Sequence, residues 1–206
     1  MEIKNFFLTK STFRLILNRL FVLFYKMSSI YRPAEDSYLL LKVLGQEIPK
    51  LLEKNSHLQF LEIGSGSGIL LKTAKRLGIK QEHIFAVDIN QQSVGHCQNL
   101  GFNCIYSDLF ENVHRKFDII VFNPPYLPKD SEESADSQIA TTGGIQGSEI
   151  INKFLKEAEN YLEKNGRIFL LTSSLTKKIN WKNYHKKFLE KEKLFFEQLY
   201  VFELRK

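Results

Sequence analysis

The sequence is poor in cysteine, with only Cys97 and Cys104 among its 206 residues. Two cysteines provide no disulfide framework, and neither a Cys-x-x-Cys pair nor two histidines at metal-ligand spacing are present. We therefore expect no metal site. Because disulfides are rare in the cytosol and free cysteines are commonly buried, we predict that both thiols are reduced packing residues of a cytoplasmic protein.

The sequence also lacks an apolar run long enough to cross a bilayer, which takes about 20 residues. The apolar stretch at residues 13–25 is shorter and is interrupted by two arginines, and no signal-peptide cleavage site follows it. No membrane contact is expected. We predict that residues 1–28 are an extension outside the main fold and that residues 29–206 form one domain. Two alternatives stay open for the extension: a true start at Met27, or an amphipathic docking helix.

The formal charge of +6 is not spread evenly along the chain. Residues 1–26 carry a net charge of +4 and residues 177–206 a net charge of +5, which leaves −3 for residues 27–176. A large nucleic-acid channel along the central segment is therefore not indicated. The basic carboxyl-terminal segment is either a solubilising face or a small contact with RNA or the ribosome.

Apolar segments alternate with segments of helical period in the first part of the chain. The expected strands are 58–63, 83–88, 102–106 and 117–122, and the expected helices begin at Asp36 and at residues 68 and 91. Strands that alternate with helices are typical of a parallel sheet covered on both faces. The sequence therefore predicts an α/β fold.

The second part of the chain is less regular. Residues 128–147 lack periodicity, which predicts a long surface loop. A helix over residues 148–163 is expected to stop at Asn165-Gly166, before a buried strand at 167–172. Residues 177–193 are few and highly charged for a helix plus a full strand, so we expect the sixth strand to be reduced.

A glycine-rich turn, Gly64-Ser65-Gly66-Ser67-Gly68, follows the first expected strand. Such glycines let backbone N–H groups approach a ligand closely, and the start of the next helix favours negative charge. Asp88, at the end of the second strand, can accept ribose hydroxyls, a role shared with NAD sites. Leu71 stands where the last glycine of Gly-x-Gly-x-x-Gly would lie when counted from Gly66. The compact turn therefore favours S-adenosylmethionine over a dinucleotide.

The strand at 117–122 runs directly into Asn123-Pro124-Pro125-Tyr126. This turn can grip a planar amide or amino nitrogen. Planar nitrogen is a poor nucleophile, so it must be held in line with a strong electrophile. Beside a cofactor that carries a sulfonium, the turn predicts methyl transfer to nitrogen.

These motifs together resemble the HemK-type glutamine methyltransferases, which modify peptide-chain release factors. The matching segments are Tyr31-Arg-Pro-Ala-Glu-Asp-Ser37, Leu61-Glu-Ile-Gly-Ser-Gly-Ser-Gly68, Val87-Asp-Ile-Asn90, Ser107-Asp-Leu109, Asn123-Pro-Pro-Tyr126 and Gly143-Gly-Ile-Gln-Gly147. They run in the family's order. The resemblance implies a Rossmann-like class I S-adenosylmethionine-dependent methyltransferase with a mostly parallel seven-stranded sheet. It is to the archaeal and eukaryotic branch, because about 30 residues precede the first motif where bacterial members have a helical domain.

The resemblance also implies the site residues. The cofactor-binding positions are Ser37, Glu62, Gly64, Ser65, Gly66, Gly68, Asp88, Ile89, Asp108, Leu109 and Asn123, and the catalytic positions are Asn123, Pro124, Pro125 and Tyr126. In this scheme the Asn123 side-chain oxygen and the Pro124 carbonyl accept hydrogen bonds from the NH₂ group of glutamine, while Tyr126 packs against the flat amide. No dedicated base is required, because the excess proton leaves during or after transfer.

The same resemblance implies two partners. One is the substrate, a class-1 release factor that is methylated on the glutamine of its Gly-Gly-Gln loop, and the other is a small zinc-binding activator subunit. The strand at 102–106 is expected at an edge of the sheet, and exposed edges invite pairing with another chain. We expect the activator to add a strand there, near Ile105. An edge protected by its own loops is the alternative.

Two rival functions stay open. An N-methyltransferase that acts on an exocyclic amino group of a DNA or RNA base would also use Asn-Pro-Pro-Tyr, but such enzymes usually need added surface to hold a flipped base. The other rival is a non-catalytic, RNA-binding scaffold with a methyltransferase fold. It would bind S-adenosylmethionine and transfer no methyl group.

Overall fold

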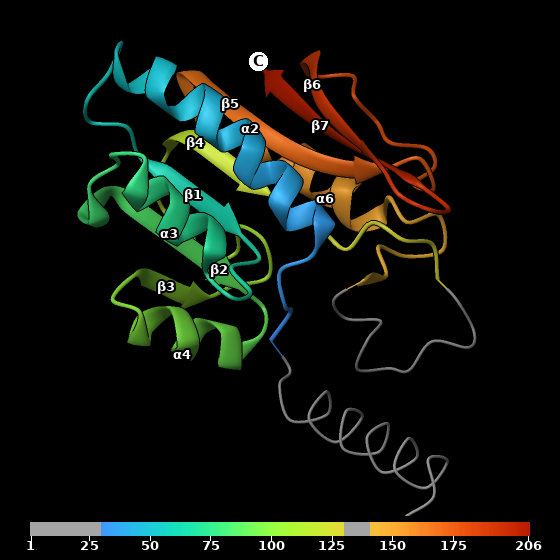
Figure 1. Ribbon diagram of the computed structural model, residues 1–206, viewed down its shortest axis with the longest axis horizontal. Helices are drawn as coiled ribbons and strands as arrows, with labels where there is room; N and C mark the ends of the chain where they lie inside the picture. Colours follow the sequence, from blue (N-terminus) through green and yellow to red (C-terminus); the bar gives the residue numbers. More distant parts are fainter. Residues whose placement is uncertain (1–29, 130–140) are drawn as a thin grey trace, which may run out of the picture.

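The computed structural model describes residues 30–129 and 141–206, and the predicted extension at residues 1–28 lies outside them. The described part contains a seven-stranded sheet with the strand order β3-β2-β1-β4-β5-β7-β6 (Figure 1). Neighbours from β3 to β5 are parallel, whereas β7 runs antiparallel to both β5 and β6. The predicted mostly parallel sheet is confirmed.

The elements follow the predicted order. They are α2 (Glu35–Leu52), β1 (Phe60–Ile63), α3 (Ile69–Arg76), a 3₁₀ turn (Gln81–His83), β2 (Ile84–Asp88), α4 (Gln91–Asn99), β3 (Asn103–Tyr106), β4 (Phe117–Phe122), α6 (Glu149–Ala158), β5 (Leu162–Ser173), β6 (His185–Lys193) and β7 (Gln198–Arg205). β4 has its predicted bounds, and β3 lies at the edge of the sheet as expected.

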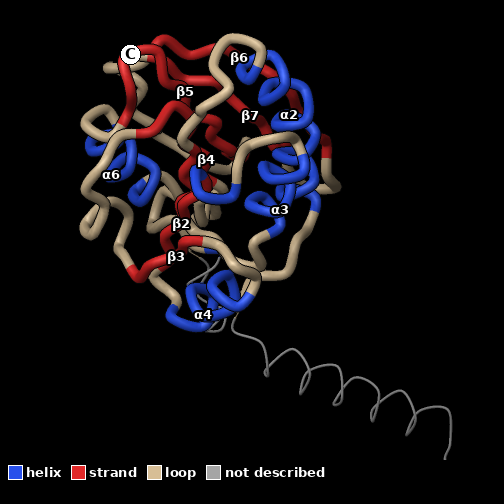
Figure 2. Tube along the Cα trace, turned by 90° about the vertical axis from the view of Figure 1, so that its left-hand side faces the viewer, coloured by secondary structure: helices blue, strands red, loops and turns tan. Residues whose placement is uncertain are grey.

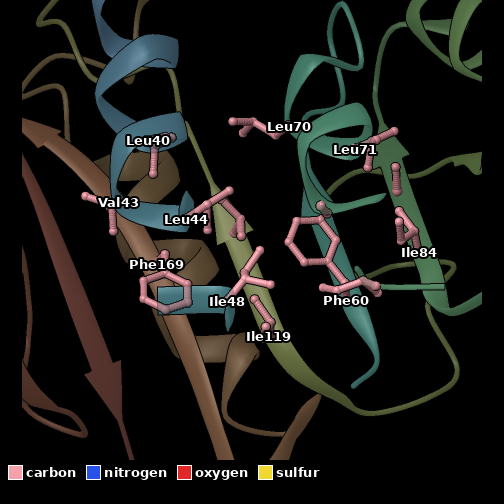
Figure 3. Close-up of a cluster of buried hydrophobic side chains, with 14 of the residues drawn as sticks. Leu40, Val43, Leu44, Ile48, Phe60, Leu70, Leu71, Ile84, Ile119 and Phe169 are labelled. Carbon is pink, nitrogen blue, oxygen red and sulfur yellow. The ribbon is translucent and has the colours of Figure 1, made fainter. Parts of the chain in front are cut away.

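Helices cover both faces of the sheet, with α2, α3 and α4 on one face and α6 on the other (Figure 2). The apolar face of α2 places Leu40, Leu44 and Ile48 against the sheet, where they meet Phe60 and Phe169 (Figure 3). Each fully buried side chain of this kind contributes about 1.5–3 kcal/mol. This packing fixes α2 across the strands, with its first turn at the carboxyl edge of β4.

The carboxyl-terminal part differs from the prediction in two places. α6 ends at Ala158 rather than near residue 163, and β5 begins at Leu162 and runs through the expected helix stop. A Cβ atom at Gly166 would lie 2.8 Å from the Leu162 side chain and 2.9 Å from the Phe117 carbonyl oxygen. Gly166 is therefore needed for the close approach of β5 to β4, not for ending a helix.

The expectation of a reduced sixth strand is wrong. β6 is a nine-residue strand that pairs with β7 along its length, with one irregularity between Phe188 and Glu190. No helix is described between Ser173 and His185, so the charged residues that seemed too few for helix plus strand form a loop and an exposed edge strand. Lysines are common on such edges because they discourage pairing with another sheet.

Candidate functional site

Parallel pairing brings the signature segments together at one edge of the sheet. Ile63, at the end of β1, pairs with Val87 of β2 and with Phe122 of β4. The glycine turn, Asp88 and Asn123 therefore follow three neighbouring strand ends. Ligands of open α/β sheets bind in this position, outside the carboxyl ends of the strands.

Asp88 holds the glycine turn in place. Its Oδ2 accepts hydrogen bonds from the Gly66 N–H at 2.9 Å and from the Ser65 hydroxyl at 3.3 Å, and its Oδ1 accepts one from the Asn90 N–H at 2.8 Å. An ionised carboxylate offers about four acceptor positions, so this geometry leaves room for one further donor. A ribose hydroxyl is a suitable donor.

The turn itself fits the methionine end of a nucleotide-like cofactor. Gly64, Gly66 and Gly68 have φ values of 71°, 46° and 70°, which side chains rarely adopt. The backbone of the turn is therefore bare of side chains at these three positions. Ile89, the next residue after β2, is 54 % exposed and could pack against an adenine ring. These residues fit S-adenosylmethionine.

Glu62 lies beneath the turn rather than in it. The side chain is buried and its Oε2 has no hydrogen-bond partner among the described residues. Burial, followed by the proximity of Cys97 and Asp88, raises the pKa of Glu62 well above its usual value. The neutral acid of Glu62 is therefore favoured.

The two cysteines, which are free and buried as predicted, belong to this site. The Cys104 Sγ lies 3.5 Å from the Ser65 Oγ, and the Cys97 Sγ lies 3.8 Å from the Gly66 carbonyl oxygen. The hydrogen bond with Cys104 lowers the pKa of Cys97 to about 7. Sequence reasoning missed that these thiols support the glycine turn, because Cys97 lies 31 positions from Gly66 and Cys104 lies 39 positions from Ser65.

The predicted cofactor positions after β3 have other contacts. The Asp108 Oδ2 lies 2.6 Å from the Lys153 Nζ of α6, and both side chains are about half exposed. Leu109 is buried and has a φ of 50°, a conformation that is uncommon for a residue with a side chain. Asp108 thus forms an exposed ion pair with α6, while the backbone at Leu109 turns sharply beside the sheet edge.

Asn123 and Tyr126 form the other end of the site. The Asn123 Oδ1 is buried and accepts no hydrogen bond from any described residue. Tyr126 packs against the hydrophobic clusters on both faces of the sheet. Burial, together with the charges of Asp36 and Glu197, raises the pKa of the Tyr126 hydroxyl far above its usual value, so the hydroxyl stays protonated.

The first turn of α2 supplies a wall that sequence reasoning assigned only in part. Asp36 is buried and accepts hydrogen bonds from the Tyr31 hydroxyl at 2.8 Å and from the Ser37 hydroxyl at 3.2 Å. Asp36, Tyr31 and Tyr126 line a small cavity together with Leu127 and Thr141. The Ser37 hydroxyl thus donates to Asp36, and its oxygen can still accept a hydrogen bond. Tyr31 and Asp36 belong to the Tyr31–Ser37 motif, but their proximity to Tyr126 depends on how α2 packs and could not be read from the motif.

The glycine segment 143–147 supports the Asn-Pro-Pro-Tyr turn from behind. The Gly143 N–H donates to the Leu127 carbonyl at 2.9 Å, and a Cβ atom at Gly143 would lie 2.5 Å from the Pro125 carbonyl oxygen. No side chain fits there. This close approach explains why glycine occupies position 143, where the sequence alone predicted only a loop.

Residues 30–129 and 141–206 contain neither a candidate metal site nor a candidate membrane span. No group of three His, Cys, Asp or Glu side chains is placed to hold a metal ion there, and no described helix is long and apolar enough to cross a membrane. A shallow, open hollow near Gln81 and Phe102 lies at the opposite end of β3 from the predicted site.

Known proteins resemble this chain in both sequence and structure. A family model described as "Methyltransferase small domain" matches residues 36–194. A relative from Methanocaldococcus jannaschii, named for protein N5-glutamine methylation, is 43 % identical over 155 residues, which are 71 % of this chain and 74 % of that protein. The eRF1 methyltransferase catalytic subunit mtq2 of Schizosaccharomyces pombe is 28 % identical over 175 residues, with coverages of 74 % and 76 %. Among solved structures, a 16S rRNA guanine N2-methyltransferase from T. thermophilus has a TM-score of 0.56 at 19 % identity, covering 85 % of this chain and 44 % of that one.

The sheet topology and the residues at its carboxyl edge thus define an enzyme with the class I fold of S-adenosylmethionine-dependent methyltransferases. Within that class, the chain belongs to the methyltransferase small-domain family and to its HemK-type branch. The resemblance found in the motifs is confirmed.

Proposed function

We propose that this enzyme methylates the side-chain nitrogen of a glutamine, the one in the Gly-Gly-Gln loop of a class-1 peptide-chain release factor. The names of its relatives support this substrate: one is named for protein N5-glutamine methylation and another as a catalytic subunit that methylates eRF1. Both relatives are matched over about three quarters of their length.

The Asn123 side chain is the observation that carries the proposal. Its Oδ1 is buried at the end of β4 without a described hydrogen-bond donor. Leaving a buried acceptor unsatisfied costs roughly 1–3 kcal/mol, so this position favours a ligand that brings an N–H group. The NH₂ group of a glutamine brings two.

The chain's own residues then act by positioning. The Asn123 Oδ1 accepts one N–H of the substrate amide, the Pro124 carbonyl accepts the other, and the ring of Tyr126 packs against the amide plane. Bound S-adenosylmethionine supplies an electrophilic methyl group, held by the glycine turn and by Asp88. Orientation of this kind contributes about 7–11 kcal/mol toward lowering a barrier. The amide nitrogen loses its excess proton during or after transfer, and the protonated Tyr126 hydroxyl is not needed as a base.

Methyl transfer from labelled S-adenosylmethionine to a purified release factor tests the proposal. The matched substrate carries Gln→Ala in its Gly-Gly-Gln loop. We expect label on the wild-type factor and none on the Gln→Ala factor. Equal labelling of the two factors would show that another residue is the acceptor.

A base of DNA or RNA is the rival acceptor, because Asn-Pro-Pro-Tyr suits any planar nitrogen. The same assay decides between them when RNA and DNA are added as acceptors in place of the factor. Label on nucleic acid with none on the factor would replace the proposed function. Cofactor binding with no transfer to any acceptor would instead support a non-catalytic scaffold.

We also propose that a small zinc-binding activator subunit pairs with the outer edge of β3. The strand order leaves this edge without a neighbour among the described strands. Ile105 is 41 % exposed and Tyr106 49 % exposed, so the edge offers apolar side chains as well as backbone groups. Strand addition of this kind combines main-chain hydrogen bonds with side-chain contacts.

The variant Ile105→Asp tests the activator interface, because it places a charge where an apolar contact is expected. We expect a loss of co-purification with the activator by at least about tenfold, as for a central interface residue. Ile145→Asp, at an exposed isoleucine in the loop before α6, is the matched control. Retention of the activator by Ile105→Asp would refute this interface.

RNA or the ribosome is a further proposed contact of the basic carboxyl-terminal segment. The Lys186 Nζ lies 4.5 Å from the ring centroid of Trp181 and 4.7 Å from that of Phe202, on a face of the β6–β7 hairpin that also presents Phe188. Glu190 faces the other way and pairs with Lys42 of α2 at 2.8 Å. Lys186→Gln is expected to reduce the salt dependence of RNA binding by a slope of about 0.7. An unchanged slope would leave a solubilising face.

We also propose a domain boundary at residue 29 and a cytoplasmic location for the protein. Residues 29–206 form the catalytic domain, with residues 1–28 as an extension to it, and the protein acts in the cytoplasm. The free thiols of Cys97 and Cys104 support a reducing compartment.

A further inference from the structure

Two neighbouring phenylalanines stand out on the surface of the hairpin formed by β6 and β7. Phe195 is 93 % exposed and Phe196 is 87 % exposed, the highest values among the large apolar side chains of the described residues. Their rings touch edge to face, with centroids 4.9 Å apart. Single exposed apolar residues are common on protein surfaces, but a fully exposed aromatic pair is typical of a contact site.

The turn that carries the pair lies at the same edge of the sheet as the acceptor site. β6 runs parallel to β5, so the turn after Lys193 falls beside the carboxyl end of β5, and Figure 1 shows it on the same side as the loop after β4. The Glu197 carboxylate accepts a hydrogen bond from the Ser173 hydroxyl, the Ser173 N–H donates to the Thr176 hydroxyl at 3.3 Å, and that hydroxyl donates to the Tyr126 carbonyl. The phenylalanine pair therefore stands beside the residue proposed to pack against the substrate amide.

Hydrogen bonds hold the turn firmly against this edge. The Leu194 N–H donates to the Glu197 carbonyl at 2.9 Å and closes the turn. Ser174 and Gln198 exchange two hydrogen bonds at 2.8 and 3.0 Å. A few residues further on, the Thr176 hydroxyl donates to the Tyr126 carbonyl at 2.8 Å. Hydrogen bonds thus fix the conformation of the turn that carries the pair and join this turn to the acceptor site. A preformed turn loses less conformational entropy when a partner binds to it.

Other exposed apolar side chains extend the same rim. Leu175 follows β5 directly, and Ile145 lies in a loop joined to it by the hydrogen bond from the Lys177 N–H to the Gln146 carbonyl at 3.0 Å. Tyr38, in the first turn of α2, is also exposed. These residues add exposed apolar side chains to segments that adjoin the acceptor site.

Charge around the turn points to the nature of the partner. Lys191 and Lys193 are exposed on the strand that leads into the turn. The exposed Glu192 lies between these two lysines, while Glu197 accepts a hydrogen bond from Ser173 and Glu190 pairs with Lys42. The charges beside the turn are therefore mixed in sign, and a partner that suits this surface presents an apolar patch.

We propose that Phe195 and Phe196 anchor the folded body of the protein substrate, outside the loop that carries the acceptor glutamine. This inference rests on the proposed function and adds to it a second point of contact on the substrate. The occupant is the substrate protein because the turn that carries the pair adjoins the acceptor site, to which hydrogen bonds join it from Glu197 through Ser173 and Thr176 to Tyr126.

Steady-state methylation of a full-length release factor by the double variant Phe195→Ser/Phe196→Ser tests the inference. We expect the KM for the factor to rise at least about tenfold, as for a pair of interface anchors, with kcat at saturating factor nearly unchanged. The affinity for S-adenosylmethionine should not change, and this affinity also reports that the variant is folded. Phe188→Ser, a 50 % exposed phenylalanine on the same hairpin but away from the turn, is the matched control and should leave the KM for the factor unchanged.

Each outcome separates the two proposals. If the wild-type enzyme transfers no methyl group to the factor, the proposed function fails. If the wild type is active and the double variant has an unchanged KM for the factor, only the docking inference fails. The alternative occupant of the phenylalanine pair is a second copy of this chain, which sedimentation of the wild type and of the double variant tests. A wild-type dimer that becomes a monomer in the double variant, with an unchanged KM for the factor, would show that the pair binds a second copy instead.

Discussion

The sheet divides into two halves whose loops carry different residues. The cofactor half, formed by β3, β2, β1 and β4, ends in the glycine turn, Asp88 and Asn123. The hairpin half, formed by β5, β7 and β6, ends in exposed phenylalanines and lysines. The groups that hold the reacting atoms thus lie in one half, and the groups proposed to select the protein substrate lie in the other. We therefore expect substitutions in the cofactor half to change the chemical step and substitutions in the hairpin half to change binding of the protein substrate.

The largest effect is expected at the end of the cofactor half, from Asn123→Ala. Removing the Oδ1 leaves the substrate amide unoriented, so kcat should fall by at least about 100-fold, as when one preorganised hydrogen bond is lost from an active site. Single-turnover transfer to bound factor measures this. Asn160→Ala, an exposed asparagine after α6, is the matched control. Activity within a few-fold of the wild type would show that Asn123 does not orient the acceptor.

A smaller effect, on cofactor binding, is expected from Asp88→Asn. Hydrogen bonds to a charged group are worth about 1.5–3 kcal/mol, so the Kd for S-adenosylmethionine should rise roughly tenfold to a hundredfold, as calorimetry can measure. Asp118→Asn is the matched control, because the Asp118 carboxylate accepts from the Gln59 N–H at 2.8 Å, at the opposite end of β4. Equal losses in the two variants would mean that Asp88 acts only through the stability of the fold.

These expectations differ in how far the sequence alone supports them. The bounds of β4 and the places of the glycine turn and of Asp88 follow from local chemistry, since strand ends and glycine turns have direct sequence signals. Asn165-Gly166 carried an equally clear signal for a helix stop and was misleading, because the contact of Gly166 with Leu162 and Phe117 is tertiary. The charged β6 was likewise hidden, because its pairing with β7 has no local signature.

The same distinction applies within the site. The proximity of Asn123 to Tyr126 could be predicted, because one turn holds both. The meeting of Asp36 with Tyr126 and the support that Cys104 gives to Ser65 could not, because each depends on how distant segments pack. Motif reasoning therefore finds residues that lie close together in one segment more readily than contacts between distant segments.

The buried Glu62 of the cofactor half is expected to make the stability of the protein depend on pH. The raised pKa of Glu62 means that the folded state keeps a proton that the unfolded state releases above about pH 4.5. The free energy of unfolding should therefore fall by up to about 1.4 kcal/mol per pH unit from this group as the pH rises above 4.5 toward the folded-state pKa. Glu62→Gln removes that contribution. Urea unfolding at pH 5 and pH 8 should show a smaller pH dependence in the variant, and an equal dependence would contradict a neutral Glu62.

The smallest effect is expected from Tyr126→Phe, which keeps the ring and removes the hydroxyl. A residue that acts as a general acid or base contributes at least about 100-fold, whereas packing against the amide needs only the ring. We expect kcat within about tenfold of the wild type and no change in the pH–rate profile up to pH 10, since the pKa of the hydroxyl is raised far above its usual value. If one of the pH-dependent limbs of the wild-type pH–rate profile were absent in Tyr126→Phe, the Tyr126 hydroxyl would be assigned to proton transfer.

The division between the two halves is tested most directly by measuring kcat and KM for the same folded release factor with Asn123→Ala and with Phe195→Ser/Phe196→Ser, side by side. We expect Asn123→Ala to lower kcat and to leave the KM for the factor nearly unchanged. We expect the double variant to raise this KM and to leave kcat nearly unchanged. Both variants lowering kcat with the same KM would contradict the account, because the hairpin turn would then contribute to the chemistry and not to the recognition of the substrate.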